Sequence, residues 1–523
     1  MPKAKSGEGV LALDLGTSSV RAVVYDTRGA MVEPTLTDLP YKVRTTESGE
    51  VSSDPDALVK LIAQSIDGAL KAARKEKVDI LGVGVSCYWH SVMGVDRAGR
   101  PTTELLTWAD TRSAHETRGL RTHFDERAYH ARTGCFFHAS YWPAKLRWLQ
   151  ATRRAAFRRT ARWISLAEYL YQEFHGDMRV SHSIASGTGL LDVHRCQWDD
   201  DALRLAGISA DHLSPLADWD EPARSLRSRF AGRWPELRAV PWYLPLGDGG
   251  LANIGAGCVS PRWPCATIGT SSALRVLLDR KRVTVPWGTF VYRVDRHHYV
   301  LGGALSEGGN VIRWFTDNLG LKPKKKYERA AGALPPDSHG LTVLPFWAGE
   351  RSPNWRGDAR AVIAGLSLGT QPAQLLRAAM ESITYQLVAV AAAMRRVMPQ
   401  PESVIATGGQ LIHSPAWSQM LADGLNLRVT TSPQSEASSR GAALLVLHAL
   451  GKFPKLWSLR PARGRSYRPR AAVHARYERA RRRQRVLYDL LFPPLGRPEH
   501  ATPIAAVGSG SRKKDLRSPA AKH

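Results

Sequence analysis

Residues 10–26 read VLALDLGTSSVRAVVYD, and this stretch decides the fold. Residues 10–15 are almost wholly apolar, as in a buried strand, and residues 20–26 predict a second strand beyond a GTSS turn. The stretch ATIGTSSALR at residues 266–275 repeats this strand–turn–strand pattern. Two such units about 250 residues apart predict two related α/β halves that face each other, and we place their boundary near Gly247.

The remaining elements fit the same α/β plan. We expect a helix from Asp54-Pro55 to about Lys75, because proline at the first helical position has no N–H to leave unpaired. Residues 80–86 predict a buried strand, residues 143–175 are largely helical, and residues 471–491 predict a terminal helix. We therefore expect domains at residues 1–247 and 248–492. Residues 493–523, a basic Pro/Gly/Ser/Lys segment, are expected to be a disordered tail.

Length and composition suit two large soluble domains. The chain has 523 residues, of which 43% are hydrophobic. This length is too great for one ordinary hydrophobic core. No run approaches the ~18 uncharged apolar residues that a membrane span requires, and the N-terminus lacks the apolar stretch of a signal peptide. The five cysteines are scattered without a C-x-x-C pair, so we expect reduced thiols. These features predict a cytoplasmic protein with no membrane partner.

The positive charge is concentrated near the C-terminus. Lys and Arg number 73 against 47 Asp and Glu, and residues 451–523 hold 19 of the former and 4 of the latter. Such an excess raises the question of nucleic acid. We expect RRRQR at residues 481–485 to be the solvated face of a packed helix, because apolar residues lie near one face: Tyr477, Val486, Leu487, Leu490 and Leu491. The tail is expected to bind polyanions weakly.

Two aspartates beside glycine-rich turns are the candidate chemical groups. Asp14 directly precedes the first GTSS turn, whose N–H groups and hydroxyls suit a phosphate, and its carboxylate suits Mg²⁺ held through water. Asp248 stands in LGDGGLANIGAG, residues 246–257, where small neighbours let a substrate hydroxyl approach and give up its proton. A third turn, TGGQ at residues 407–410, suits an adenine or ribose. Each of these motifs, seen alone, is also consistent with a structural turn that has no role in binding or catalysis.

In their order along the chain, these motifs resemble the FGGY carbohydrate kinases, most of all the gluconate-kinase branch, from Asp14 to about Leu491. The matching motifs are LDLGTSS at 13–19, TWADTRS at 107–113, SIASGTGLLD at 183–192, GDG at 247–249, TIGTS at 267–271, LPFWAGERSP at 344–353, ATGG at 406–409 and EASSRGAA at 436–443. The resemblance implies an α/β fold of two actin-like ATPase (ribonuclease H-like) domains flanking a catalytic cleft. It also implies ATP and Mg²⁺ as cofactors.

The resemblance further implies roles for individual residues. Asp248 would be the general base and Asp14 the residue that holds Mg²⁺. The expected phosphate and nucleotide ligands are Thr17, Ser18, Ser19, Arg21, Gly269, Thr270, Gly309, Arg313, Gly409 and His413. The expected substrate ligands are His90, Trp108, Asp110, Arg112 and Asp248.

Three stretches depart from the family pattern, all on the sugar side. They are YWHS at 88–91 where Met-His is common, the more aromatic TGCFFHASYW at 133–142, and Ser306-Glu307 in place of Asn-Asn. The prediction is therefore ATP-dependent phosphorylation of a small sugar or sugar acid, D-gluconate to 6-phosphogluconate first of all. A xylulose-like ketose or a polyol is the alternative substrate. An inactive nucleotide- or nucleic-acid-binding protein is a further alternative, which the intact Asp14 and Asp248 oppose. A homodimer is left open.

Overall fold

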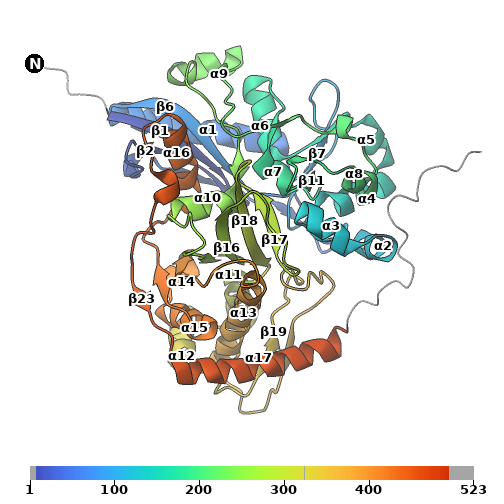
Figure 1. Ribbon diagram of the computed structural model, residues 1–523, viewed down its shortest axis with the longest axis vertical. Coiled ribbons are helices and arrows are strands. Elements are labelled where there is room, and N and C mark those ends of the chain that lie inside the picture. Colours follow the sequence, from blue (N-terminus) through green and yellow to red (C-terminus); the bar gives the residue numbers. More distant parts are fainter. Residues whose placement is uncertain (1–6, 323, 494–523) are drawn as a thin grey trace, which may run out of the picture.

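The computed structural model describes residues 7–322 and 324–493 and consists of two α/β halves stacked along the long axis (Figure 1). The first half contains a five-stranded sheet in the order β14-β6-β1-β2-β3. Its strands are β1 (Gly7–Leu15), β2 (Ser19–Asp26), β3 (Thr37–Pro40), β6 (Val78–Cys87) and β14 (Leu246–Gly247). The second half contains a seven-stranded sheet in the order β17-β18-β16-β15-β21-β22-β23. Its strands are β15 (Cys265–Ile268), β16 (Ser272–Asp279), β17 (Phe290–Arg293), β18 (His298–Leu305), β21 (Val404–Thr407), β22 (Val429–Thr431) and β23 (Ser466–Tyr467).

Both sheets are built on one strand plan. In the first, β1 pairs antiparallel with β2 and parallel with β6, and β6 pairs parallel with β14. In the second, β15 pairs antiparallel with β16 and parallel with β21, which pairs parallel with β22. The antiparallel side continues in both, through β3 and β18. The duplicated, actin-like α/β architecture predicted from the sequence is thus confirmed.

Helix α1 (Pro55–Lys75) shows how local chemistry sets an element's bounds. The Asp54 carboxylate accepts the N–H groups of Asp56 and Ala57 at 2.9 and 3.1 Å, which caps the helix where Pro55 begins it. Its apolar face, which includes Ile62 and Ile66, is buried against β2. The helix therefore has the bounds predicted from the sequence.

The segment between β6 and β14 is a helical insertion over the carboxyl ends of the first sheet. The predicted helical stretch 143–175 is interrupted by a strand, β9 (Arg162–Ile164), which pairs with β7 (Met93–Val95). The helices are α2 (Glu116–His123), α3 (Glu126–Thr133), α4 (Trp142–Thr152), α5 (Arg154–Arg159), α6 (Leu166–His175), α7 (His182–Ser186), α8 (Asp200–Ala206) and α9 (Ser228–Arg233). The other short strands of the first half are β4 (Arg44–Thr45), β5 (Val51–Ser53), β8 (Leu105–Leu106), β10 (Val180–Ser181), β11 (Leu191–Asp192), β12 (Gln197–Trp198) and β13 (Leu216–Ala217).

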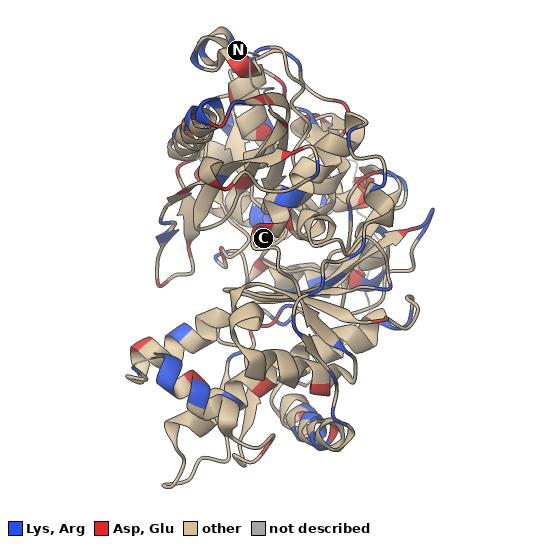
Figure 2. Cartoon of the chain, turned by 90° about the vertical axis from the view of Figure 1, so that its left-hand side faces the viewer, with Lys and Arg blue, Asp and Glu red and all other residues tan. Residues whose placement is uncertain are grey.

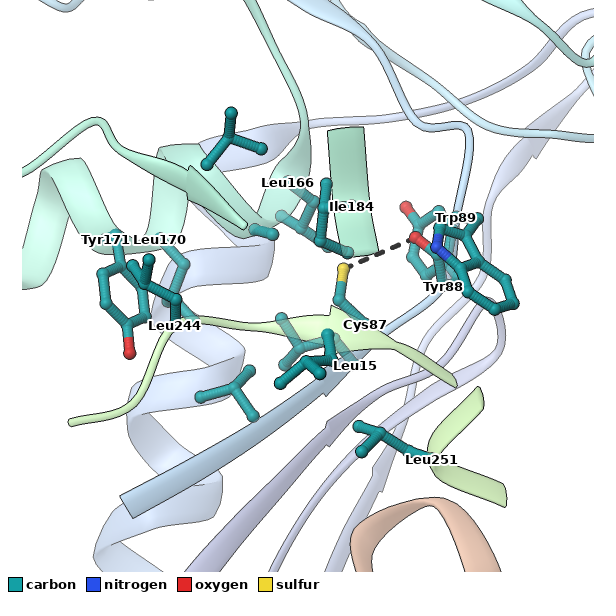
Figure 3. Packing of buried hydrophobic residues seen from close by; sticks show 14 of the residues in the cluster. Leu15, Cys87, Tyr88, Trp89, Leu166, Leu170, Tyr171, Ile184, Leu244 and Leu251 are labelled. Atoms are coloured by element: carbon teal, nitrogen blue, oxygen red, sulfur yellow. Dashed lines mark hydrogen bonds between the residues drawn. The ribbon is translucent and has the colours of Figure 1, made fainter. Parts of the chain in front are cut away.

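This insertion shares one hydrophobic core with the sheet. Figure 3 shows Cys87, at the end of β6, among Leu15, Leu166 and Ile184, with its thiol donating to the Tyr88 carbonyl oxygen at 3.5 Å. All five cysteines of the chain are free thiols.

Helix α16 (Ala437–Ala449) follows the second sheet in the chain, yet it packs on β1 and β6 of the first sheet and on α10 (Asp248–Gly255) (Figure 1). The two helices cross at glycines: a Cβ on Gly441 would lie 2.0 Å from the Leu251 carbonyl oxygen, and one on Gly255 would lie 1.8 Å from that of Ala437. The domain boundaries at residues 247 and 492 stay predictions. The predicted tail, apart from Pro493, lies outside the described residues.

The helices of the second half are α11 (Gly309–Asn318), α12 (Lys324–Ala333), α13 (Pro372–Met394), α14 (Gly409–His413), α15 (Pro415–Leu425) and α17 (Ala471–Leu491), with strands β19 (Thr342–Leu344) and β20 (Val362–Ala364). Helix α17 has the predicted bounds, and of its predicted apolar face Tyr477 is buried and Leu487 half-buried, but the prediction is wrong for Val486, Leu490 and Leu491. Val486 and Leu490 are 61% and 74% exposed. The buried face combines apolar packing of Tyr477 and Tyr488 with polar contacts, since Tyr477 donates to Glu381 at 3.0 Å and Gln484 to the Val343 carbonyl oxygen at 2.7 Å.

Basic side chains are scattered over both halves with acidic ones among them (Figure 2). Within residues 7–322 and 324–493, no helix combines the length and apolar character needed to cross a bilayer.

Candidate active site

Three segments far apart in sequence meet at one edge of the first sheet. Strands β1 and β14 both run parallel to β6, so their carboxyl ends lie together. In this register Asp14 lies opposite Ser86, and Gly247 lies opposite Cys87. Asp248 therefore begins α10 beside Asp14, and the segment with His90 follows β6 between them.

Asp248 has the environment of a general base. The N–H of Gly249 donates to Oδ1 at 2.6 Å. Burial raises the pKa of Asp248 to about 6, helped by the negative charge of Asp14 and opposed by Arg275 and Arg351. The carboxylate is thus mostly ionised at neutral pH while its pKa lies close enough to neutrality to take a proton.

The glycines on each side of Asp248 make room for Trp89. A Cβ on Gly247 would lie 1.8 Å from Trp89 Cε2, and one on Gly249 would lie 2.7 Å from Cζ3. The Trp89 indole N–H is fixed by the Ser183 carbonyl oxygen at 2.9 Å. The GDG motif therefore lets a fixed aromatic ring pack directly beside the carboxylate.

Asp14 is 7% exposed and shares Arg21 with two other acids. Arg21 lies 3.4 Å from Asp14, 3.1 Å from Asp38 and 3.6 Å from Glu436. The turn that follows is closed by the Gly16 N–H on the Ser19 carbonyl oxygen at 3.1 Å. Of its predicted phosphate ligands, Thr17 is half-buried, Ser18 exposed and Ser19 buried, and phosphate binding by these residues and Arg21 stays a prediction.

The residues at this edge fit a Mg²⁺ ion that accompanies a nucleotide. Mg²⁺ is usually bound through one or two carboxylates plus substrate phosphates, and the Asp14 carboxylate beside Asp248 offers such hard oxygen donors. A separate cluster of Asp337, His339 and Glu381 has metal-like spacing. Its buried carboxylate, however, already pairs with Arg377, so this cluster serves as a structural link.

The second sheet presents the predicted nucleotide residues at the corresponding edge. The carboxyl ends of β15 and β21 meet there, and a cavity of about 180 Å³ is lined by Gly269, Thr270, Gly309, Arg313, Thr316 and Gln410. The first four of these were predicted from the sequence. Gly409 and His413 are the first and last residues of α14, the helix that contributes Gln410 to this cavity.

Two lining residues of this cavity were missed, although the sequence contained signals for both. Thr316 lies three residues after Arg313 on α11, hence on the same helix face. Gln410 directly follows Gly409 in the quoted turn. Nucleotide contacts by the whole set stay predictions.

His90, a predicted substrate ligand, is a buried neutral histidine with one acceptor nitrogen. It is 7% exposed, and Nδ1 lies 2.5 Å from the Gly187 carbonyl oxygen. Because a carbonyl oxygen only accepts, Nδ1 carries the proton and Nε2 keeps its lone pair. Burial first, and then the charges of Arg351 and Lys145, lowers the pKa of His90 to about 3. Its ring packs edge-on against Tyr141 at a centroid distance of 5.0 Å.

The predicted ligands Asp110 and Arg112 form a buried ion pair. Arg112 donates from Nη2 to Asp110 Oδ2 at 2.7 Å, and Asp110 also accepts the Val51 N–H at 3.1 Å. Arg112 stacks on Trp148, 4.6 Å from the ring centroid. The pair braces the loop that carries the half-buried Trp108, and direct substrate contact by these three residues stays a prediction.

Two further arginines at the site had no predicted role. Arg275 on β16 donates from Nη2 to Thr267 Oγ1 at 3.0 Å and opposes the raised pKa of Asp248. Arg351, in the second half, also opposes the raised pKa of Asp248 through its positive charge. Arg351 stands inside the LPFWAGERSP motif that resembles the family, whereas Arg275 lies four residues beyond the TIGTS motif, in the strand that follows the turn.

Comparison with known proteins identifies the class. The FGGY carbohydrate kinase N-terminal domain model matches residues 9–255, and the C-terminal domain model matches residues 265–450. The chain therefore belongs to the FGGY family of carbohydrate kinases and is an ATP-dependent sugar kinase.

The relatives that resemble this chain include kinases named for different substrates. The chain is 28% identical over 470 residues to a gluconokinase of Bacillus subtilis (strain 168), covering 88% of this chain and 91% of that one. It is 28% identical over 468 residues to a glycerol kinase of Rhodospirillum centenum, covering 86% and 92%. A Lactobacillus acidophilus gluconate kinase structure matches with a TM-score of 0.85 at 24% identity, over 94% and 99% of the chains, and supports the fold.

Proposed function

We propose that this kinase transfers the γ-phosphoryl group of ATP to a hydroxyl of a sugar acid, with D-gluconate converted to 6-phosphogluconate as the first candidate. The observation that carries the proposal is the position of Asp248, at the start of α10 and beside Asp14, with a pKa of about 6. The gluconokinase relatives support the choice of acid.

In this mechanism Asp248 moves one proton. Gly249 holds Oδ1, which leaves Oδ2 to accept the hydroxyl proton while the substrate oxygen attacks the γ-phosphorus. Nε2 of His90 accepts a hydrogen bond from another hydroxyl and so orients the sugar. Asp14 would hold Mg²⁺ through water, and the bound ion would neutralise phosphate charge.

The nucleotide lies, in this proposal, along the second half. Arg313 is exposed at the rim of the cavity formed by Gly269, Thr270 and Gly309, where its charge favours phosphates. Transfer would then occur between the two sheets, with the surrounding side chains limiting the access of water to the γ-phosphate.

A xylulose-like ketose or a polyol is the second candidate substrate. The glycerol kinase relatives, at an identity similar to that of the gluconokinases, favour it. A cytoplasmic location, a homodimer and weak polyanion binding by the tail stay predictions.

A coupled ADP-release assay with Mg-ATP tests the proposal across gluconate, other sugar acids, xylulose, pentitols and glycerol. We expect the highest kcat/KM for gluconate or another sugar acid. Preference for a ketose or glycerol would favour the second candidate. Tight ATP binding with no turnover on any compound would contradict the kinase activity proposed here.

A further inference from the structure

Arg351 is a buried cation without an acidic partner among the described residues. Its side chain is 8% exposed overall, and Nε is fully buried without a hydrogen-bond partner. Burying a charge without a partner is costly, so an unpaired guanidinium at a catalytic site suggests that a ligand supplies the missing anion.

Two tryptophans hold this guanidinium. Its central carbon lies 5.4 Å from the ring centroid of Trp108 and 5.7 Å from that of Trp355. Trp355 is fully buried and lies 5.5 Å from His138 and 5.7 Å from Tyr141, measured between ring centroids. The aromatic rings orient the arginine without neutralising its charge.

Ring contacts connect Arg351 to the catalytic carboxylate. The Tyr141 hydroxyl bonds that of Tyr292 at 2.6 Å, and Tyr292 packs on Trp89 at 4.9 Å between centroids. Trp89 in turn packs on the glycines flanking Asp248. The guanidinium and Asp248 thus face one continuous group of residues.

The nearest acids in the sequence do not neutralise Arg351. Glu350 accepts hydrogen bonds from Tyr488 and Asn354, both at 2.6 Å, and so points to α17. Glu307 accepts the Ala348 N–H at 3.1 Å, and burial raises its pKa to about 8, which keeps it largely protonated at neutral pH. On the other side, Asp110 is paired with Arg112.

A second buried cation adds to the positive character. Lys145 on α4 donates to the carbonyl oxygens of Asp110, at 3.5 Å, and of Ala139. Burial lowers the pKa of Lys145 to about 7, so it carries a partial positive charge at neutral pH. Both His90 and His138 are neutral beside these cations, since burial and the charge of Arg351 lower the pKa of each.

We propose that Arg351 binds the carboxylate of a sugar-acid substrate and makes this kinase select sugar acids over neutral polyols of the same length. A guanidinium offers two parallel N–H groups to a carboxylate, which a hydroxymethyl group does not match. The inference rests on the proposed function and names the residue that decides its substrate class.

Gluconate and glucitol make a matched pair of probes, because they differ in one terminal group, carboxylate against hydroxymethyl. Their dissociation constants would be measured by calorimetry on wild type, Arg351→Gln and Arg356→Gln, with kcat and KM alongside. Arg356 lies five residues further on and pairs with Asp358 at 3.0 Å, so its variant controls for disturbance of this loop.

We expect Arg351→Gln to weaken gluconate binding by roughly 100-fold while changing glucitol binding and the KM for ATP by less than about threefold. Arg356→Gln should leave all these constants near those of wild type. Arg351→Gln should melt no lower than wild type, because the change removes an unpaired buried charge.

Equal losses for gluconate and glucitol, or unchanged gluconate binding, would overturn the proposal. So would a wild-type protein that binds glucitol as tightly as gluconate. Because binding is measured without ATP, gluconate that binds through Arg351 but is never phosphorylated would refute the proposed function alone.

Discussion

The two halves share one strand plan but place different groups at its ends. Two residues before the first GTSS turn stands Asp14, whereas the same place before the second turn is held by Thr267. Thr267 bonds Thr407 at 2.7 Å and accepts from Arg275. The duplicated fold therefore supplies two equivalent loop positions, and the residue at each decides that the acid chemistry belongs to the first half.

The two halves also differ in how deeply their site residues are buried. Asp14 and His90 are buried in the first half, whereas Thr270, Arg313, Gly409 and His413 are exposed in the second. A buried carboxylate has a raised pKa and suits proton transfer, while an exposed rim suits a ligand that must enter and leave. The difference implies that substitutions in the first half should mainly change the rate of phosphoryl transfer. Substitutions in the second half should mainly change nucleotide binding.

The crossing of α16 and α10 gives the largest expected loss of stability. In Gly441→Ala, the new methyl would meet the Leu251 carbonyl oxygen at 2.0 Å, so α16 must move from α10, which carries Asp248. We expect the free energy of unfolding to fall by about 3 kcal/mol, as for a severe overpacking change, and the melting temperature with it. Gly119→Ala in α2 is the matched control, because nothing lies within 4 Å of its added Cβ. An unchanged melting temperature for Gly441→Ala would mean that α16 and α10 are not tightly packed at this crossing.

The pH dependence probes the first half. Burial raises the pKa of Asp248 from its ordinary 3.8 to about 6, so the group is protonated below pH 6 and cannot accept the substrate proton. We expect kcat/KM for the sugar to fall about tenfold per pH unit below pH 6, as for one essential base. A rate that stays flat down to pH 5 would exclude a base with this pKa.

Arg313→Ala probes the second half with a smaller expected effect. Removing this exposed charge at the nucleotide cavity should raise the KM for ATP about fivefold, the size typical of one solvent-screened phosphate contact. The KM for the sugar should stay the same. Arg396→Ala, at an exposed position after α13, is the control. If the sugar KM rises instead, the proposed division of labour is wrong.

The sequence was most informative where local chemistry dominates. The two hairpins, the Asp54 cap of α1 and the bounds of α17 follow from apolar runs, prolines and turn residues. The exposure of Val486 and Leu490 on α17 did not follow, because partners far away in the chain, such as Val343 for Gln484, decide which side of the helix is covered.

The candidate site divides in the same way. Asp14, Asp248 and the glycine turns stand in short motifs and could be named from the chain alone. The arrangement of Trp108 and Trp355 around Arg351, with Tyr141 against Trp355, joins residues from both halves, and no local pattern contains it. The Asp110–Arg112 pair likewise gave no sign in the sequence that the two side chains would bond each other.

The most direct test of the account is the turnover of Asp248→Asn on gluconate, measured by ADP release beside wild type, with ATP binding measured by calorimetry. The account predicts that kcat falls by roughly 10²–10⁴, the usual contribution of a general base, while the dissociation constant for ATP changes little. A variant that retains more than about a tenth of the wild-type kcat would contradict the role of Asp248 as the base.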